Sequence, residues 1–243
     1  MSFSKKLDDL HLWFRQNWWI WLFSIFTRIA LSFAFIAAGF VKINGERFTD
    51  LHNKQPMGHY LQAVYETGYY YTFIGFMQLI AAILLLIPRT VLLGVLIYLP
   101  IILNICILSW SVRFEGSLFT SPLMVIACLF LMWWHYDSLK YILPFHRKSL
   151  SCVLPKQILH KKFPYLFFIC VATTMIGVIF ISATIFDVKP RNTQLNCNDQ
   201  FKDGNRKIAG KAFCSCVHSE GQTLKKCLDE YFEAEDDAVI KLR

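Results

Sequence analysis

The sequence has few charged residues, and the signatures of several soluble protein classes are absent from it. Only 17% of its 243 residues are charged, whereas a soluble domain usually carries about 25%. It has no glycine-rich phosphate loop, no zinc-type repeat, no internal repeat and no C-x-x-C motif. Residues 1–17 lack the short apolar region and small-residue cleavage site of a signal peptide. The chain therefore does not fit a nucleotide-binding, zinc-binding or thioredoxin-like soluble protein.

Long hydrophobic blocks stand where those motifs are missing. Hydrophobic residues make up 55% of the chain, and its mean hydropathy is +0.40. A helix needs roughly 20 apolar residues to cross a hydrocarbon core about 30 Å thick, so the blocks predict several membrane-spanning helices. We expect five spans, at residues 18–42, 72–87, 90–112, 121–136 and 164–186. The predicted fold class is an all-α polytopic membrane helical bundle.

The charges of the connections predict how the chain is oriented. Segment 144–163 is strongly basic, and basic connections between spans face the cytoplasm. An odd number of spans then places the N-terminus in the cytoplasm and the tail, residues 187–243, outside it. The basic residues lie beside apolar spans, which accounts for the net charge of +8 without nucleic acid as a partner. Residues 1–17 carry apolar side chains at helical spacing and predict an amphipathic helix at the membrane interface; an irregular basic tail is the alternative.

Four of the eight cysteines lie in the tail. An even number of cysteines in a short exported segment indicates disulfides. We expect two short helices, about 204–218 and 222–235, joined near Gly221. This hairpin would place one of Cys214 and Cys216 opposite Cys227, while the thiols of the C-x-C pair point roughly 200° apart and suit different partners. We therefore predict two structural disulfides among Cys197, Cys214, Cys216 and Cys227, with a redox-active C-x-C pair as the alternative. Cys106, Cys128, Cys152 and Cys170 are expected to be free. No metal site is expected, because His218 is the one histidine near the tail cysteines.

Three polar residues lie inside the predicted spans. Arg28 falls about ten residues into the first span, near the bilayer midplane, where an arginine is costly unless it faces protein or water. Gln78 and Asn104 each lie roughly 10 Å below the outer surface on the second and third spans. We expect Arg28 to face the bundle interior, with Gln78 and Asn104 as its nearest partners. The trio forms either a structural hydrogen-bond cluster or a polar intramembrane pocket for a lipid headgroup, quinone or small substrate.

The motifs of the first four spans resemble those of a known family. They are RIALSFAFIAAGFVKI, FIGFMQLIAAILLLIPRTVLLGVLIYLPIILNI and WWHYDSLKYIL. Together, over roughly residues 20–143, they resemble the DoxX family of bacterial inner-membrane proteins. The resemblance implies a four-helix transmembrane core, here 18–143, to which the fifth transmembrane helix at 164–186 and the tail are additions. Besides the polar trio, the family-like positions are Gly39, Lys42, Pro88, Arg89 and Asp137. From the sequence alone, Lys42 is expected to be an interfacial anchor and Asp137 to pair with lysines near its helix end.

Three functions compete on this basis. The resemblance implies a subunit of a membrane redox complex, with a quinone as the candidate cofactor and a quinone or thiol as the link. The residues themselves show no nucleophile–base pair, metal cluster or haem-binding histidine pair, which favours a non-enzymatic accessory or scaffold protein with a protein partner in the membrane or at the tail. The third hypothesis is a carrier or binder of a small molecule or lipid through the polar pocket. Enzymatic activity is implied only by the resemblance.

Overall fold

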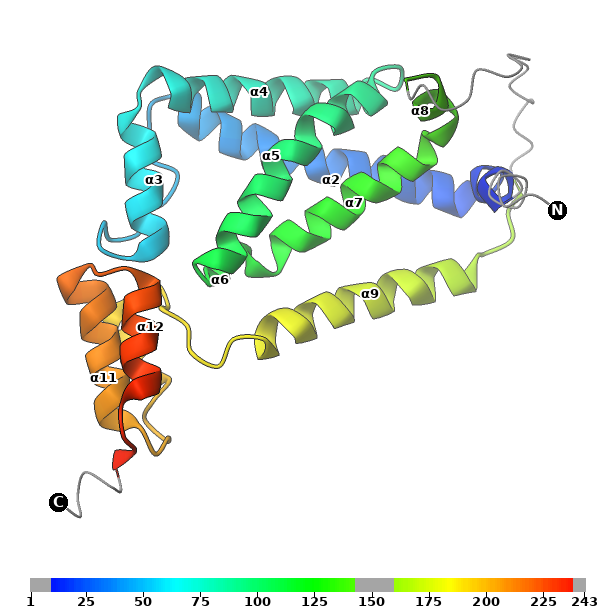
Figure 1. Ribbon diagram of the computed structural model, residues 1–243. Helices are drawn as coiled ribbons and strands as arrows, with labels where there is room; N and C mark the ends of the chain where they lie inside the picture. Colours follow the sequence, from blue (N-terminus) through cyan, green and yellow to red (C-terminus); the bar gives the residue numbers. More distant parts are fainter. Residues whose placement is uncertain (1–9, 143–159, 238–243) are drawn as a thin grey trace.

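The computed structural model describes residues 10–142 and 160–237 of the chain. These residues form helices and no strand, and five helical stretches are long and apolar enough to cross a membrane. They are α2 (Trp18–Ile43), α4 (Tyr69–Leu86), α5 (Val91–Ser111), the consecutive pair α6 (Glu115–Leu118) and α7 (Thr120–Trp134), and α9 (Tyr165–Thr184). The predicted all-α polytopic membrane bundle is therefore confirmed (Figure 1). The fourth span begins before the expected residue 121, because the preceding connection folds into α6.

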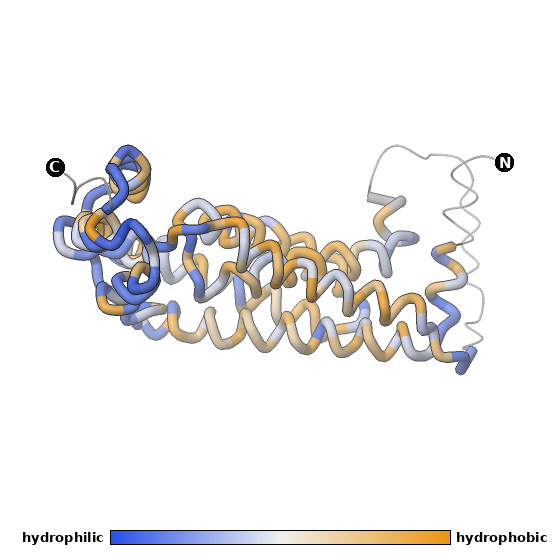
Figure 2. Tube along the Cα trace, turned by 90° about the horizontal axis from the view of Figure 1, so that it is seen from below, coloured by the Kyte–Doolittle hydropathy of each residue, from blue (hydrophilic) through white to orange (hydrophobic). Residues whose placement is uncertain are grey.

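The two ends of the bundle carry different segments. At one end, here called the N-terminal end, lie the helical residues 10–15, the turn between α4 and α5, and α8 (Tyr136–Ile142). At the opposite end, here called the tail end, lie α3 (Pro56–Glu66), α6 and the tail (Figure 1). Figure 2 shows hydrophobic residues along the spans and hydrophilic residues gathered at the tail end. Most of the predicted basic loop, 144–163, lies outside the described residues.

Four of the spans form a packed core, and the fifth lies beside it. Residues of α2, α4, α5 and α7 build one buried cluster, in which Phe35 stacks on Tyr98 with ring centroids 3.4 Å apart. The Tyr98 hydroxyl donates to the Leu31 carbonyl oxygen at 3.1 Å, so its polar group is satisfied inside the core. By contrast, α9 buries only 6% of its most hydrophobic stretch. The arrangement is a four-helix core with an added, largely uncovered helix.

One close helix contact in the core joins α2 to α4. A Cβ atom added to Gly39 would lie 2.9 Å from the Gly75 carbonyl oxygen, and one added to Gly75 would lie 3.0 Å from the Gly39 carbonyl oxygen. These distances are at or below the shortest that real Cβ contacts show, so the two backbones can approach this closely because neither residue has a side chain. Small residues serve this purpose between membrane helices, where van der Waals packing supplies much of the association energy. The structure thus assigns a packing role to the family-like Gly39.

The N-terminal segment is bound to the start of α8. Residues 10–15 are helical and lie across the N-terminal end of the bundle (Figure 1). Arg15 Nη1 donates to Asp137 Oδ2 at 2.9 Å, and His11 Nδ1 lies 3.7 Å from the same oxygen. The partners of Asp137 among the described side chains are therefore the N-terminal residues rather than lysines. Asn17 caps α2 through its side-chain oxygen and donates to the Lys162 carbonyl oxygen at 2.8 Å, which also ties the start of α9 to this end.

The tail folds as a small helical unit around two disulfides. It contains α10 (Gln194–Asp199), α11 (Lys207–Ser215), the π-helical turn η1 (Cys216–Glu220) and α12 (Leu224–Glu233). Gly221, with φ of 69°, ends η1 and reverses the chain, as expected of the predicted hairpin. The disulfides join Cys197 to Cys214 and Cys216 to Cys227. The predicted pair of disulfides is confirmed, and Cys216 is the member of the C-x-C pair that bonds to Cys227.

Candidate functional site

Arg28 binds the C-terminal end of α4. Its Nε donates to the Leu85 carbonyl oxygen and its Nη2 to the Leu86 carbonyl oxygen, both at 2.8 Å. Thr90 Oγ1 donates to the Leu84 carbonyl oxygen at 2.9 Å. These are carbonyls that a helix end leaves without an internal partner, and a positive charge is favourable there. Arg28 therefore has a structural role as the cap of α4.

The predicted trio of Arg28, Gln78 and Asn104 is not formed. Gln78 is 1% exposed and faces the core, with its Oε1 atom unpartnered among the described residues. Asn104 is exposed on the outer surface of α5. Arg28 bonds the end of α4, which lies about 10 Å along the helix from Gln78 at about 1.5 Å per residue. The prediction that these residues are partners is therefore wrong, because they lie at different depths and on different faces.

The remaining family-like residues have separate structural positions. Lys42 is 9% exposed, donates to the Ala38 carbonyl oxygen at 3.1 Å, and has its Nζ atom 4.4 Å from the Phe48 ring centroid. It is a buried cation over an aromatic ring, not an anchor extended to the interface. Pro88 and Arg89 are exposed in the tight turn between α4 and α5, as the hairpin prediction required. None of these residues lies in a shared ligand site.

The structure instead brings functional groups together where the tail meets the bundle. Arg191 of the tail forms an ion pair with Glu115 at the start of α6. Arg113 Nη1 donates to the Val188 carbonyl oxygen at 2.6 Å. Burial lowers the pKa of the Arg113 guanidinium and the nearby Asp187 carboxylate raises it; an arginine in this setting stays charged. Arg113 of the bundle and Arg191 of the tail thus each contribute a contact that holds the tail against the bundle.

A second set of contacts comes from the loop that precedes α3. Lys54 Nζ donates to the Ser219 carbonyl oxygen of η1. Gln55 is fully buried; its Oε1 accepts from the Gly58 backbone and its Nε2 donates to the Arg191 carbonyl oxygen at 3.4 Å. Sequence reasoning missed this docking surface, since its acceptors are mostly backbone carbonyls. The positive φ angles of Arg113 (53°) and Arg191 (54°) are likewise invisible in the sequence; non-glycine residues rarely adopt them, and they often mark functional or tightly held positions.

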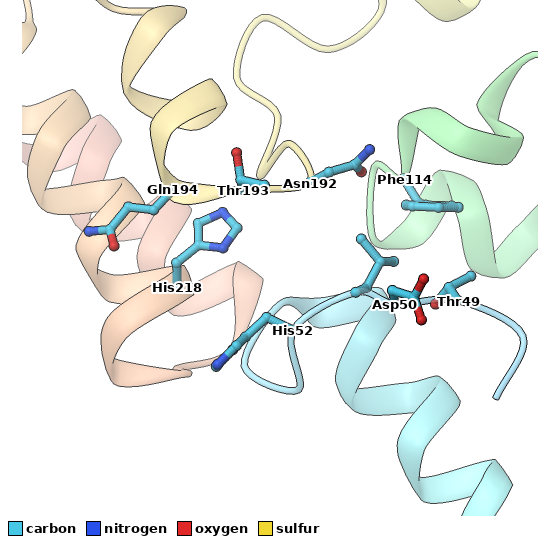
Figure 3. A pocket seen from close by; sticks show the side chains of 9 residues that line it. Thr49, Asp50, His52, Phe114, Asn192, Thr193, Gln194 and His218 are labelled. Atoms are coloured by element: carbon cyan, nitrogen blue, oxygen red, sulfur yellow. The ribbon is translucent and has the colours of Figure 1, made fainter.

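A cavity of about 690 Å³ lies next to these contacts, between the α2–α3 loop, the residue before α6 and the tail. In Figure 3 the His218 ring projects toward Thr193, while Asp50 and Thr49 lie across the cavity beside Phe114. His52 and Gln194 extend away from Asp50, so the polar groups do not converge on one point (Figure 3). The His218 ring is fixed by a 2.7 Å contact between Nε2 and the Pro190 carbonyl oxygen. This cavity can hold a small polar molecule or a segment of a partner protein, but it does not present an arranged set of catalytic groups.

The sulfur atoms of the tail are shielded. Cys197, Cys214 and Cys227 are 0% exposed and Cys216 is 4% exposed, and all four belong to the apolar cluster of the tail. Thiol exchange requires access to a disulfide sulfur, so these bonds fit structural cross-links. Cys106, Cys128 and Cys170 are free, whereas Cys152 lies outside the described residues. Within the described parts of the chain, no three His, Cys, Asp or Glu side chains are grouped to hold a metal ion.

Comparison with known proteins identifies a relative. The chain is 34% identical over 113 residues to the uncharacterized protein YwoB of Bacillus subtilis (strain 168), a match that covers 44% of this chain and 72% of that protein. The chain belongs to the YwoB family. More than half of the chain lies outside this match, so membership of the YwoB family describes only part of the molecule. No family model matches the chain, and no solved structure matches it.

Proposed function

We propose that this protein is an accessory or scaffold subunit of a membrane complex, and that it holds its disulfide-bonded tail in a fixed position for a partner protein. The observation that carries the proposal is the docking of the tail. An ion pair and hydrogen bonds from two separate loops fasten it to the bundle. A tail that served only as a tether would not need these contacts, whereas a presented binding surface requires a defined orientation.

The proposed location is the bacterial inner membrane, with the N-terminus cytoplasmic and the tail periplasmic or otherwise extracytoplasmic. Two features at opposite ends of the bundle support this orientation. The basic segment 144–163 follows the span that ends at the N-terminal end, and basic connections favour the cytoplasmic side. The disulfides lie at the tail end, and disulfides persist in oxidising compartments.

A redox link, which the DoxX resemblance implies, would come through the partner complex. The buried disulfide sulfurs are poorly placed for exchange with a thiol partner. The polar trio proposed to hold a quinone is dispersed over two depths. We therefore propose that any quinone chemistry belongs to a subunit with which this protein assembles.

A second candidate function is the binding of a small polar molecule in the cavity beside the tail. Its volume of about 690 Å³ falls within the range of about 300–1,000 Å³ typical of ligand sites. Asp50, Asn192 and Thr193 offer a carboxylate, an amide and a hydroxyl along its lining. This candidate replaces the intramembrane pocket as the site for a carrier or binding function.

The two candidates are distinguished by purification from native membranes in a gentle detergent, followed by mass spectrometry of proteins, lipids, quinones and small molecules. The scaffold function predicts a protein partner in near-stoichiometric amount. The double variant Lys54→Ala, Glu115→Ala removes two bundle-side attachments of the tail and should reduce the partner several-fold. Lys202→Ala is the matched control, because Lys202 pairs with Asp199 within the tail. A small molecule that co-purifies without any protein would favour the cavity, and a partner retained equally by all variants would contradict the docking argument.

A further inference from the structure

The side chain of Asn104 lies on the outer surface of α5, inside the span. It is exposed, and no hydrogen bond to its amide occurs among the described residues. Ser111 ends α5, so Asn104 lies about 10 Å from that end at about 1.5 Å per residue. An asparagine amide has two N–H donors and a carbonyl oxygen with two lone pairs. At this depth lipid chains offer no hydrogen-bond partner for them.

The other exposed polar side chains of the spans differ from Asn104 in this respect. The hydroxyls of Thr173, Thr174 and Thr184 on α9 each donate to a carbonyl oxygen of their own helix. Ser111 is the last residue of α5, at the interface. Thr120 is the first residue of α7. Apart from these, the exposed side chains of the five described spans are apolar, sulfur-containing or the tyrosines at helix starts. Asn104 is therefore the exposed amide on these spans that has neither a partner nor a place at the interface.

Asn104 lies in the middle of a regular stripe. Residues 93, 97, 100, 104, 107 and 111 follow one another at alternating steps of four and three, and all but Ile97 are exposed. At about 100° per residue they lie within roughly 40° of one line along α5. Leu93 and Ile107 are 52% and 62% exposed. Alternating steps of three and four are the pattern by which two helices pack along a left-handed seam.

We propose that this stripe is the contact between two copies of the chain, which associate about a two-fold axis normal to the membrane with their Asn104 side chains hydrogen-bonded to each other. Copies with the same topology place their α5 helices parallel, so a residue near the crossing point meets its own counterpart at the same depth. The amide is self-complementary: each carbonyl oxygen accepts from the N–H of the other copy. A single asparagine in an apolar seam is a known device for fixing register and a two-stranded state.

A second copy fits this surface better than an unrelated partner. An unrelated helix would need its own polar group at the same depth, whereas a second copy always supplies one. A two-fold contact is also the commonest form of self-association in proteins. The contact lies on α5, and the tail and its docking loops lie beyond the end of this helix (Figure 1). The proposed self-association and the proposed scaffold function therefore use separate surfaces, and an experiment can contradict one without contradicting the other.

The test is the self-association of the full-length chain in vesicles of phosphatidylcholine and phosphatidylglycerol. Energy transfer between donor- and acceptor-labelled copies, measured over a range of protein-to-lipid ratios, gives the dissociation constant of the dimer. Asn104→Leu should raise this constant about tenfold, which corresponds to about 1.4 kcal/mol for the two hydrogen bonds. Asn104→Gln keeps the amide and should stay within about threefold of the wild type. Leu129→Ala, at a 50% exposed position on α7, is the control and should have no effect.

Cross-linking in native membranes identifies the occupant directly. With Cys106, Cys128, Cys152 and Cys170 replaced by alanine, Asn104→Cys should form an oxidised species of twice the monomer mass, and Leu129→Cys should not. Because Asn104 and Leu129 are both exposed, neither change opens the core. Energy transfer that is independent of protein-to-lipid ratio, equal constants for the wild type and Asn104→Leu, or a cross-link from position 104 to a different protein would each overturn the proposal.

Discussion

Replacing Arg28 by leucine tests whether this arginine is the cap of α4. The substitution removes two hydrogen bonds, to the Leu85 and Leu86 carbonyl oxygens, and leaves both carbonyls without the side-chain donor that pairs them. Hydrogen bonds between membrane helices contribute about 0.6 kcal/mol each on average and up to about 1.7 kcal/mol. We therefore expect Arg28→Leu to lower the free energy of unfolding in the membrane-like state by about 1–3 kcal/mol. Arg28→Lys should lie between the wild type and the leucine variant, because an ammonium lacks the forked geometry that reaches two carbonyls at once.

The measurement separates insertion from folding. Inserting an arginine at a helix centre costs about 2.5–3.5 kcal/mol, so Arg28→Leu should enter the membrane at least as well as the wild type. Its reversible unfolding in mixed detergent micelles, followed by tryptophan fluorescence, should nonetheless show the loss of stability. Arg89→Leu is the matched control, since Arg89 is an exposed arginine in the turn that follows α4. If Arg28→Leu and Arg89→Leu unfold within about 0.5 kcal/mol of each other, Arg28 does not act as a cap.

Three further predictions follow from the fold, the cross-links and the charges. Gly39→Ala places a methyl group 2.9 Å from the Gly75 carbonyl oxygen and should cost about 1–3 kcal/mol in thermal or detergent unfolding, whereas Gly177→Ala, with no atom within 4 Å, should cost nothing. Non-reducing peptide mapping should recover the pairs Cys197–Cys214 and Cys216–Cys227; any crossed pair would refute this fold of the tail. Reporter fusions should show a cytoplasmic position for Lys148 and an extracytoplasmic one for Arg243, and an active cytoplasmic reporter at Arg243 would reject the proposed orientation.

The spans and the disulfide framework could be predicted from the sequence because they depend on local composition. Blocks of apolar residues give the span positions to within a few residues, since length and hydropathy are the main requirements for crossing a membrane. The hairpin about Gly221 limited the partner of Cys227 to two cysteines, and the fold selects Cys216. The sequence offered no comparable signal for α10, a helix of six residues.

The prediction that Arg28, Gln78 and Asn104 are partners was wrong because it rested on depth in the membrane alone. The distance of a residue from the end of its span gives its depth, but this distance does not determine which face of the helix the residue occupies. Gln78 faces the core and Asn104 faces outward, although their predicted depths are similar. Arg28 donates to backbone carbonyl oxygens at the end of α4. Such unpaired carbonyls depend on where a helix ends and cannot be recognised from residue types. The docking of the tail was missed for the same reason, because Lys54, Gln55 and Arg113 also donate to backbone oxygens.

The order of the disulfides has a consequence for how the tail is made. Its cysteines pair in the order in which they occur along the chain, first with second and third with fourth, across separations of 17 and 11 residues. In the proposed orientation the tail is exported with residue 187 leading, and Cys197 and Cys216 then each meet their native partner as the next thiol to emerge. Short loops also close at a low entropic cost. If the tail is exported in this way, we expect oxidation in order of emergence to yield the native pairing without an isomerase to reshuffle incorrect bonds.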